Sequence, residues 1–121
     1  MSDQDTSLHE LKADFEKFVK ERDWVQFHNP KDLAISISVE AAELLETFQW
    51  KETNPPEKVK LDEKTMNKIK EELADIIIYC LGMANRLDVD VSSIVKNKIK
   101  RNAEKYPVEK AKGSSKKYTE L

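Results

Sequence analysis

The sequence predicts an all-α fold, a four-helix bundle protomer completed by oligomerisation. Charged residues make up 36% of the 121 residues, against about 25% in an average protein, whereas there are only 2 glycines and 4 prolines. Apolar residues recur at helical spacing, beginning with Leu8, Leu11 and Phe15. The length suits a single domain over 1–121, with a basic tail over about 108–121.

Capping residues and prolines set the limits of the expected helices. Ser7 and Glu10 form a capping box at the start of the first helix, and Asn29 with Pro30 gives the second helix an N-cap followed by proline at the first helical position. A short aromatic connector separates these two helices. The expected helices therefore span about 8–22 and 30–50.

A surface loop is expected after the second helix, over 51–61, because this stretch contains Asn54-Pro55-Pro56 and has no apolar period. The third helix should begin near Asp62 or Glu63 and continue to about Leu87. The last helix should begin around Ser92 and end before Pro107, since proline disfavours helix in the residue ahead of it.

Charge and composition exclude several classes of function. The net charge of −2 gives no electrostatic reason to expect nucleic-acid or membrane binding. No apolar run reaches the roughly 18 residues of a membrane span, and the chain start lacks the basic residues of a secretory signal. The single cysteine, Cys80, cannot form an internal disulfide. We expect a cytoplasmic protein.

Two acidic pairs are the most informative feature. Glu40 and Glu43, and again Glu72 and Asp75, have i, i+3 spacing inside the two most apolar stretches of the chain. A carboxylate that loses water must pair, coordinate a metal or stay protonated. A divalent cation bound by oxygen would satisfy all four if the two helices pack antiparallel. The alternatives are an ordinary solvated helix edge for the first pair and a structural salt bridge to Arg86 or a lysine for the second.

The third helix has apolar residues on almost all sides between Leu73 and Leu81. A protomer of four helices can cover only some of these side chains. The sequence therefore predicts at least a dimer.

The last helix places Lys98, Asn102 and Tyr106 four residues apart, on the same side as its apolar residues. A lysine, an amide and a phenol in a row can donate hydrogen bonds to phosphate oxygens. The alternative for Lys98 is snorkelling along the edge of the core.

Aromatic residues lie near the helix ends and the acidic stripe. Rings can stack on nucleobases, and amide or imidazole groups can read base edges, although ordinary core packing is the alternative. The candidate base-contacting residues are Trp24, Gln26, His28, Trp50 and Tyr79.

These motifs in this order resemble the MazG-like all-α nucleoside triphosphate pyrophosphohydrolases, close to the dCTP pyrophosphatase branch. The resemblance covers nearly the whole chain. It rests on the motifs Glu21-Arg-Asp-Trp-Val-Gln-Phe-His28, Glu40-Ala-Ala-Glu-Leu44, Phe48-Gln-Trp50, Glu71-Glu-Leu-Ala-Asp75 with Tyr79, Asn102-Ala-Glu-Lys-Tyr-Pro107 and Lys117-Tyr-Thr-Glu-Leu121.

The resemblance implies an Mg²⁺-dependent enzyme, with Mn²⁺ as a substitute metal, that splits dCTP or a related or modified deoxynucleoside triphosphate into the monophosphate and pyrophosphate. It also implies a homodimer or homotetramer that cleans the nucleotide pool. The metal-binding and catalytic residues would be Glu40, Glu43, Glu72 and Asp75, the base would meet Trp24, Gln26, His28, Trp50 and Tyr79, and the phosphates Lys98, Asn102 and Tyr106. Two other functions fit the residues alone: a non-catalytic nucleotide- or metal-sensing module, and a purely structural oligomerisation bundle.

Overall fold

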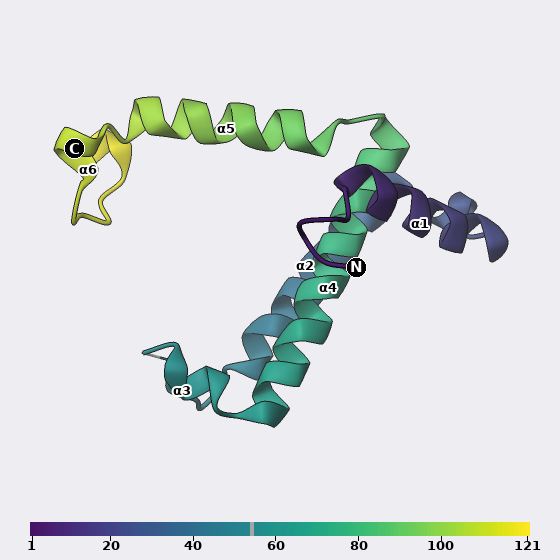
Figure 1. Cartoon of the computed structure of the whole chain (residues 1–121), viewed down its shortest axis with the longest axis horizontal. Helices are drawn as coiled ribbons and strands as arrows, with labels where there is room; N and C mark the ends of the chain where they lie inside the picture. The colour runs from purple at the N-terminus through teal and green to yellow at the C-terminus, as the bar shows by residue number, and fades with distance from the viewer. Residues whose placement is uncertain (54) are drawn as a thin grey trace. The chain divides into compact units, whose positions relative to one another are not determined.

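The computed structural model describes residues 1–53 and 55–121, and the described chain contains helices and no β-strand, which confirms the all-α class (Figure 1). The α-helices are α1 (Leu8–Glu21), α2 (Pro30–Thr47), α3 (Glu57–Lys60), α4 (Glu63–Leu87), α5 (Val91–Lys105) and α6 (Val108–Ala111), and two 3₁₀ turns, η1 and η2, span Val25–Phe27 and Tyr118–Glu120.

The chain divides into two compact units, Met1–Asp88 and Val89–Leu121. The first unit contains α1 to α4 and the second contains α5, α6 and η2. The single domain expected from the sequence stays a prediction.

Each of the four long helices begins with a side chain that caps its backbone. Carbonyl, hydroxyl or carboxylate oxygens at the N-cap accept hydrogen bonds from backbone N–H groups that have no partner inside the helix. The pairs are Ser7 with the N–H of Glu10 (3.1 Å), Asn29 with that of Asp32 (2.9 Å), Asp62 with that of Thr65 (3.2 Å) and Asp90 with that of Ser93 (3.0 Å). The two predicted caps at Ser7 and Asn29 are confirmed.

Two predictions about the limits of the elements were wrong. Helix α2 ends at Thr47 instead of about Trp50, because the N–H groups of Phe48 and Gln49 bond to carbonyls three residues back and tighten the last turn. The expected loop over 51–61 contains a short helix, α3, which begins directly after Pro56. The last helix begins at Val91, after its cap Asp90, which agrees with the predicted start around Ser92. Asn54, part of the predicted loop, lies outside the described residues.

The first unit is organised around α4. Helix α2 packs along α4 and runs in the opposite direction, and α1 packs against α4 as well (Figure 1). The buried apolar side chains come from these three helices: Val19 from α1, Leu33 from α2, and Leu81 and Ala84 from α4. Leu33 has 1% of its surface exposed and is the most deeply buried large side chain. This small core fixes the three helices against each other.

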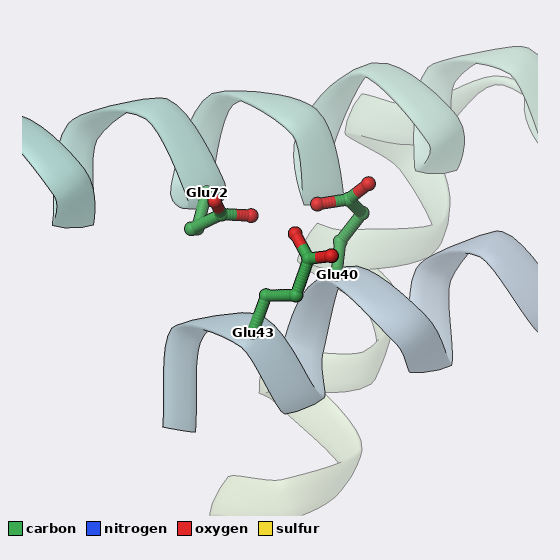
Figure 2. A group of neighbouring side chains, drawn as sticks. All are labelled: Glu40, Glu43 and Glu72. Carbon is green, nitrogen blue, oxygen red and sulfur yellow. The ribbon is translucent and has the colours of Figure 1, made fainter. Parts of the chain in front are cut away.

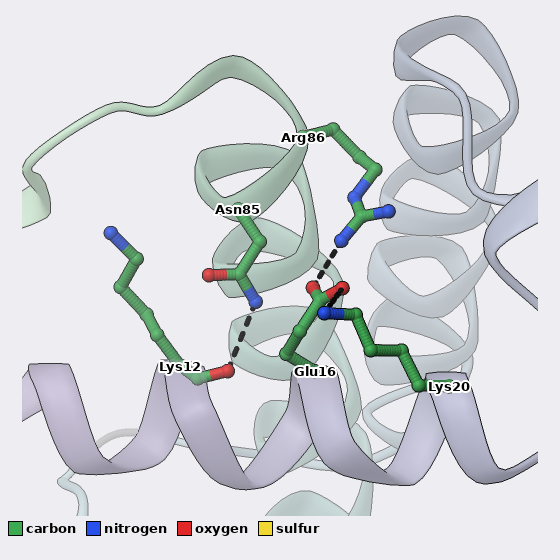
Figure 3. A network of polar contacts seen from close by, with 5 residues as sticks. All are labelled: Lys12, Glu16, Lys20, Asn85 and Arg86. Carbon is green, nitrogen blue, oxygen red and sulfur yellow. Dashed lines mark hydrogen bonds and ion pairs between the residues drawn. The ribbon is translucent and has the colours of Figure 1, made fainter.

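A polar network fastens α1 to the C-terminal end of α4 (Figure 3). The Arg86 guanidinium donates a hydrogen bond to the Glu16 carboxylate, and the Lys20 ammonium lies 3.8 Å from the same carboxylate. The amide of Asn85 donates to the backbone carbonyl of Lys12 over 3.0 Å. Arg86 and Glu16 are both largely shielded from water, so this pair holds its geometry better than an exposed one.

In the second unit, the predicted basic tail packs on the C-terminal end of α5. The rings of Tyr106 and Tyr118 meet edge to face with centroids 6.1 Å apart, and the Lys105 ammonium lies 4.9 Å from the Tyr118 ring. The apolar side of α5 is exposed within this chain, at Ile94, Val95 and Ile99. Along the described residues, none of the helices combines the length and the apolar character needed to cross a bilayer.

Truncating Leu33 should destabilise the fold much more than truncating an exposed leucine. Leu33→Ala removes buried methyl groups and leaves a cavity, so we expect it to lower the free energy of unfolding by about 2–5 kcal/mol. Leu61 is 87% exposed, and Leu61→Ala should change it by less than about 0.5 kcal/mol. Urea unfolding of both variants at one protein concentration measures the difference, and equal losses would contradict the assigned core.

Candidate active site

Three carboxylates meet where α2 packs along α4. Glu40 and Glu43 point from α2 and Glu72 points from α4 toward one space between the helices (Figure 2). One oxygen from each can be chosen so that all three lie within 4.8 Å of one another. The i, i+3 spacing puts the two glutamates of α2 on one side of that helix, and the antiparallel packing brings Glu72 opposite them.

Asp75, the fourth predicted acid, does not belong to this group of three. It follows Glu72 by three residues, which moves it about 4.5 Å further along the axis of α4. Asp75 is half-buried, and its negative charge still raises the pKa of Glu40. It therefore lies at the edge of the cluster.

The cluster shares a proton. The pKa of Glu40 is raised to about 7, first by its hydrogen bond with Glu72, then by loss of water, and then by Glu43 and Asp75. The pKa of Glu72 is lowered, mainly because Lys68 hydrogen-bonds to its carboxylate. Below about pH 7, Glu40 therefore holds a proton more readily than Glu72 does.

Lys68 is a member of this site that the sequence analysis did not name. Its ammonium lies 2.7 Å from Glu72 Oε1, one helical turn away on α4, and Glu72 itself is only 3% exposed. The sequence left open a salt bridge from this acidic pair to a lysine or to Arg86. The structure has the lysine bridge, from Lys68 to Glu72, whereas Arg86 pairs with Glu16. The i, i+4 spacing of Lys68 and Glu72 was the available sequence signal.

The ammonium of Lys68 does not supply a hydrogen bond to every buried oxygen of the cluster. The Oε2 atoms of Glu40 and Glu72 are buried and have no hydrogen-bond partner. An acceptor oxygen without a donor is costly away from water, and a cation supplies what it lacks. Several carboxylate oxygens converging on one point form the donor set that Mg²⁺ and Mn²⁺ prefer. The residues present fit a hard divalent cation.

An aromatic cavity of about 620 Å³ lies beside the acids. Asp75 and Tyr79 of α4 line it, so it borders the carboxylate cluster. Burial raises the pKa of Tyr79, and the charges of Glu40 and Asp75 raise it further, so the phenol keeps its proton and remains a donor. The opposite wall comes from α1 and the connector after it and includes Phe15, Phe18, Trp24 and His28.

The rings of this wall are packed on one another. His28 lies 5.8 Å from Phe15 and 6.5 Å from Trp24, measured between ring centroids, and Trp24 meets Phe18 edge to face. The pKa of His28 is lowered, first by burial and then by the positive charge of Arg86, while Glu16 opposes the shift. A neutral imidazole can both donate and accept a hydrogen bond, as reading a base edge requires.

The structure thus brings Trp24, His28 and Tyr79 to the cavity but not the other two predicted base contacts. Trp50 is 94% exposed and follows the end of α2 with a φ of +66°. Gln26 belongs to the connector between α1 and α2, where its amide donates a hydrogen bond to the backbone carbonyl of Asp23 at 3.0 Å. It does not line the cavity.

The three predicted phosphate-contacting residues lie in the second unit. Lys98 and Asn102 are exposed on α5, and the backbone carbonyl of Asn102 accepts a hydrogen bond from the N–H of Tyr106, the residue that caps this helix. Their roles stay predictions.

Comparison with known proteins assigns the family. The MazG-like family model matches residues 35–121. The dCTP pyrophosphatase 1 proteins of Mus musculus and Homo sapiens are each 37% identical over 115 residues, which cover 95% of this chain and 68% of theirs. The crystal structure of a pyrophosphatase from Archaeoglobus fulgidus matches with a TM-score of 0.75 and 36% identity, over 88% of this chain and 98% of that one. With its all-α fold and its cluster of helix-borne carboxylates, the chain belongs to the MazG-like family.

Proposed function

We propose that this nucleotide pyrophosphohydrolase uses Mg²⁺ to hydrolyse dCTP, or a related or modified deoxynucleoside triphosphate, to the monophosphate and pyrophosphate. The observation that carries the proposal is the cluster of Glu40, Glu43 and Glu72, with two buried oxygens that lack partners, beside an aromatic cavity. The base preference follows the relatives named dCTP pyrophosphatase 1. Removal of unwanted deoxynucleotides in the cytoplasm would be its cellular role.

Glu40, Glu43 and Glu72, with Asp75 at the edge of the cluster, would hold the metal, and Mn²⁺ would substitute for Mg²⁺. A divalent cation bound there would offset phosphate charge and make a coordinated water easier to deprotonate. Glu40 or Glu43 would accept the proton of the water that attacks the α-phosphorus. The choice between these two carboxylates stays open, because both lie beside the space where the metal would bind.

The cavity would hold the base. Trp24 offers an apolar ring face, His28 a neutral imidazole and Tyr79 a phenol donor. We also retain Gln26 and Trp50 as base contacts and Lys98, Asn102 and Tyr106 as phosphate contacts. The exposed indole of Trp50 is available to a nucleotide or to a second copy of the chain.

We further propose that the enzyme is a homodimer or homotetramer. Apolar side chains remain exposed on α4 at Leu73 and Ile77 and on α5 at Ile94 and Ile99. Val89–Leu121 also contains 9 of the 21 lysines and arginines but only 4 of the 23 acidic residues, so the second unit of one copy is complementary in charge to the first unit of another. Covering these apolar faces would add the core that a short chain lacks.

The products test the reaction. Incubated with dCTP and Mg²⁺, the protein should release dCMP and pyrophosphate in equal amounts, and excess chelator should abolish turnover. Glu72→Gln should reduce kcat/KM by at least about 100-fold, because it removes an anionic oxygen donor. Chromatography of the nucleotides with a pyrophosphate-specific assay measures this. Release of orthophosphate and a diphosphate would refute the proposal, and tight binding without turnover would favour the non-catalytic sensing module.

The pH dependence of stability tests the carboxylate cluster. Because the pKa of Glu40 is about 7 when folded and 4.5 ordinarily, the metal-free folded protein holds a proton that the unfolded chain loses, and stability from this group falls as pH rises from about 4.5 to about 7. The lowered pKa of Glu72 acts below that window, where its contribution is lost as pH falls. Thermal unfolding in the presence of a chelator should give a melting temperature that decreases as the pH rises through this window.

Glu40→Gln should remove this decrease in melting temperature with rising pH, since glutamine does not titrate. Mg²⁺ should raise the melting temperature of the parent more above pH 7 than near pH 4.5, because cation and proton compete for the same carboxylates. An unchanged pH profile in Glu40→Gln would show that Glu40 does not hold the shared proton.

The assembly can be measured directly. Light scattering at low micromolar concentration should give at least twice the mass of 14.0 kDa, and replacing Ile99 with Glu should shift the population toward monomer, since it introduces a charge on the exposed apolar face of α5. Asn97→Glu, at an exposed neutral position two residues away on α5, adds the same single negative charge and controls for the change of charge alone. A fully active monomer would overturn the assembly proposal.

A further inference from the structure

Gly82 lies in the C-terminal part of α4, five residues before its end at Leu87, and is buried. Glycine destabilises a helix interior relative to alanine, and its backbone here is that of an ordinary helix, so conformational freedom does not explain its presence. Space does. A Cβ atom at this position would lie 2.9 Å from Cε2 of Phe15 and 3.5 Å from Cδ2 of Leu33.

The contact with Phe15 matters because Phe15 lines the aromatic cavity. Its ring extends from α1 to α4, lies over the bare backbone at Gly82, and has its centroid 5.8 Å from that of His28 on the cavity wall. A side chain at residue 82 would collide with the edge of the Phe15 ring at Cε2. Leu33 is almost fully buried and lies 3.5 Å from the same Cβ position, so the added carbon has no free space on that side either. Relief of the contact requires the ring to shift, and a shift of this ring alters the cavity because Phe15 lines it.

We propose that Gly82 is a positioning residue that sets the depth of the base cavity, because it leaves room for the Phe15 ring to pack against the backbone of α4. The inference rests on the proposed function, in which this cavity receives the base of a nucleoside triphosphate. Gly82 touches no reacting group. It acts through Phe15, and the cavity depth decides how large a base the enzyme accepts.

The test is a set of variants measured over triphosphates of increasing base size: dCTP, 5-methyl-dCTP and dATP. Gly82→Ala should raise KM while leaving kcat within about twofold, and the loss in kcat/KM should increase with base size to about tenfold or more for the largest base accepted, since a single carbon atom in a pocket has an effect of this order. Phe15→Leu alone should relax the discrimination against larger bases. Gly82→Ala with Phe15→Leu should restore the substrate profile.

A matched control separates this role from general packing. Gly82→Ala with Leu33→Val relieves the longer contact of 3.5 Å and should not restore the profile. If Gly82→Ala fails to fold, the comparison of the parent with Phe15→Leu still tests whether this ring limits base size. A parent that hydrolyses dCTP while Gly82→Ala and Phe15→Leu keep its base preference would overturn the inference. A parent without pyrophosphohydrolase activity would instead refute the proposed function.

Discussion

The packing of α2 along α4 is the constraint from which the rest of the site follows, because it brings together carboxylates that repel one another. Glu40, Glu43 and Glu72 cannot all be ionised at this distance without a counter-charge. Helix packing holds them there, since Leu33 on α2 and Leu81 on α4 are buried in the same core. The apolar contacts thereby stabilise an electrostatic arrangement that the acids alone would disrupt.

The position of α1 gives this cluster its neighbouring cavity. Glu16 on α1 pairs with Arg86 on α4, and Asn85 donates to the backbone of Lys12, so the aromatic side chains of α1 are held at a fixed distance from Asp75 and Tyr79. Arg86 has a second effect, because its charge lowers the pKa of His28. One network thus determines both the shape of the cavity wall and the protonation of a residue on it.

The parts of the fold that depend on local chemistry could be predicted from the sequence. The caps at Ser7 and Asn29 and the face shared by Glu40 and Glu43 follow from spacing along one helix. The separation of Asp75 from the other acids could not be predicted, because it depends on how far α2 is displaced along α4.

The exposure of Trp50 also escaped prediction, because the last turn of α2 tightens and the chain leaves the helix before reaching it. For Lys98, Asn102 and Tyr106, spacing places three donors on one helix but carries no information about what that helix meets. The sequence signal at Gly82 is a glycine that follows the apolar stretch of α4, and it can be interpreted only when the ring of Phe15 is placed beside it.

The ion pair between Lys68 and Glu72 reduces the negative charge of the seam between α2 and α4 whether or not a cation is bound. Without one, the proton on Glu40 and the ammonium of Lys68 leave the three carboxylates with a single net negative charge. With one divalent cation in place of the proton, the same groups sum to zero. The difference between the two states is one unit of charge, so exchange of the proton for a cation would change the repulsion between α2 and α4 only slightly. The scaffold that carries the acids would then keep the same helix packing in both states.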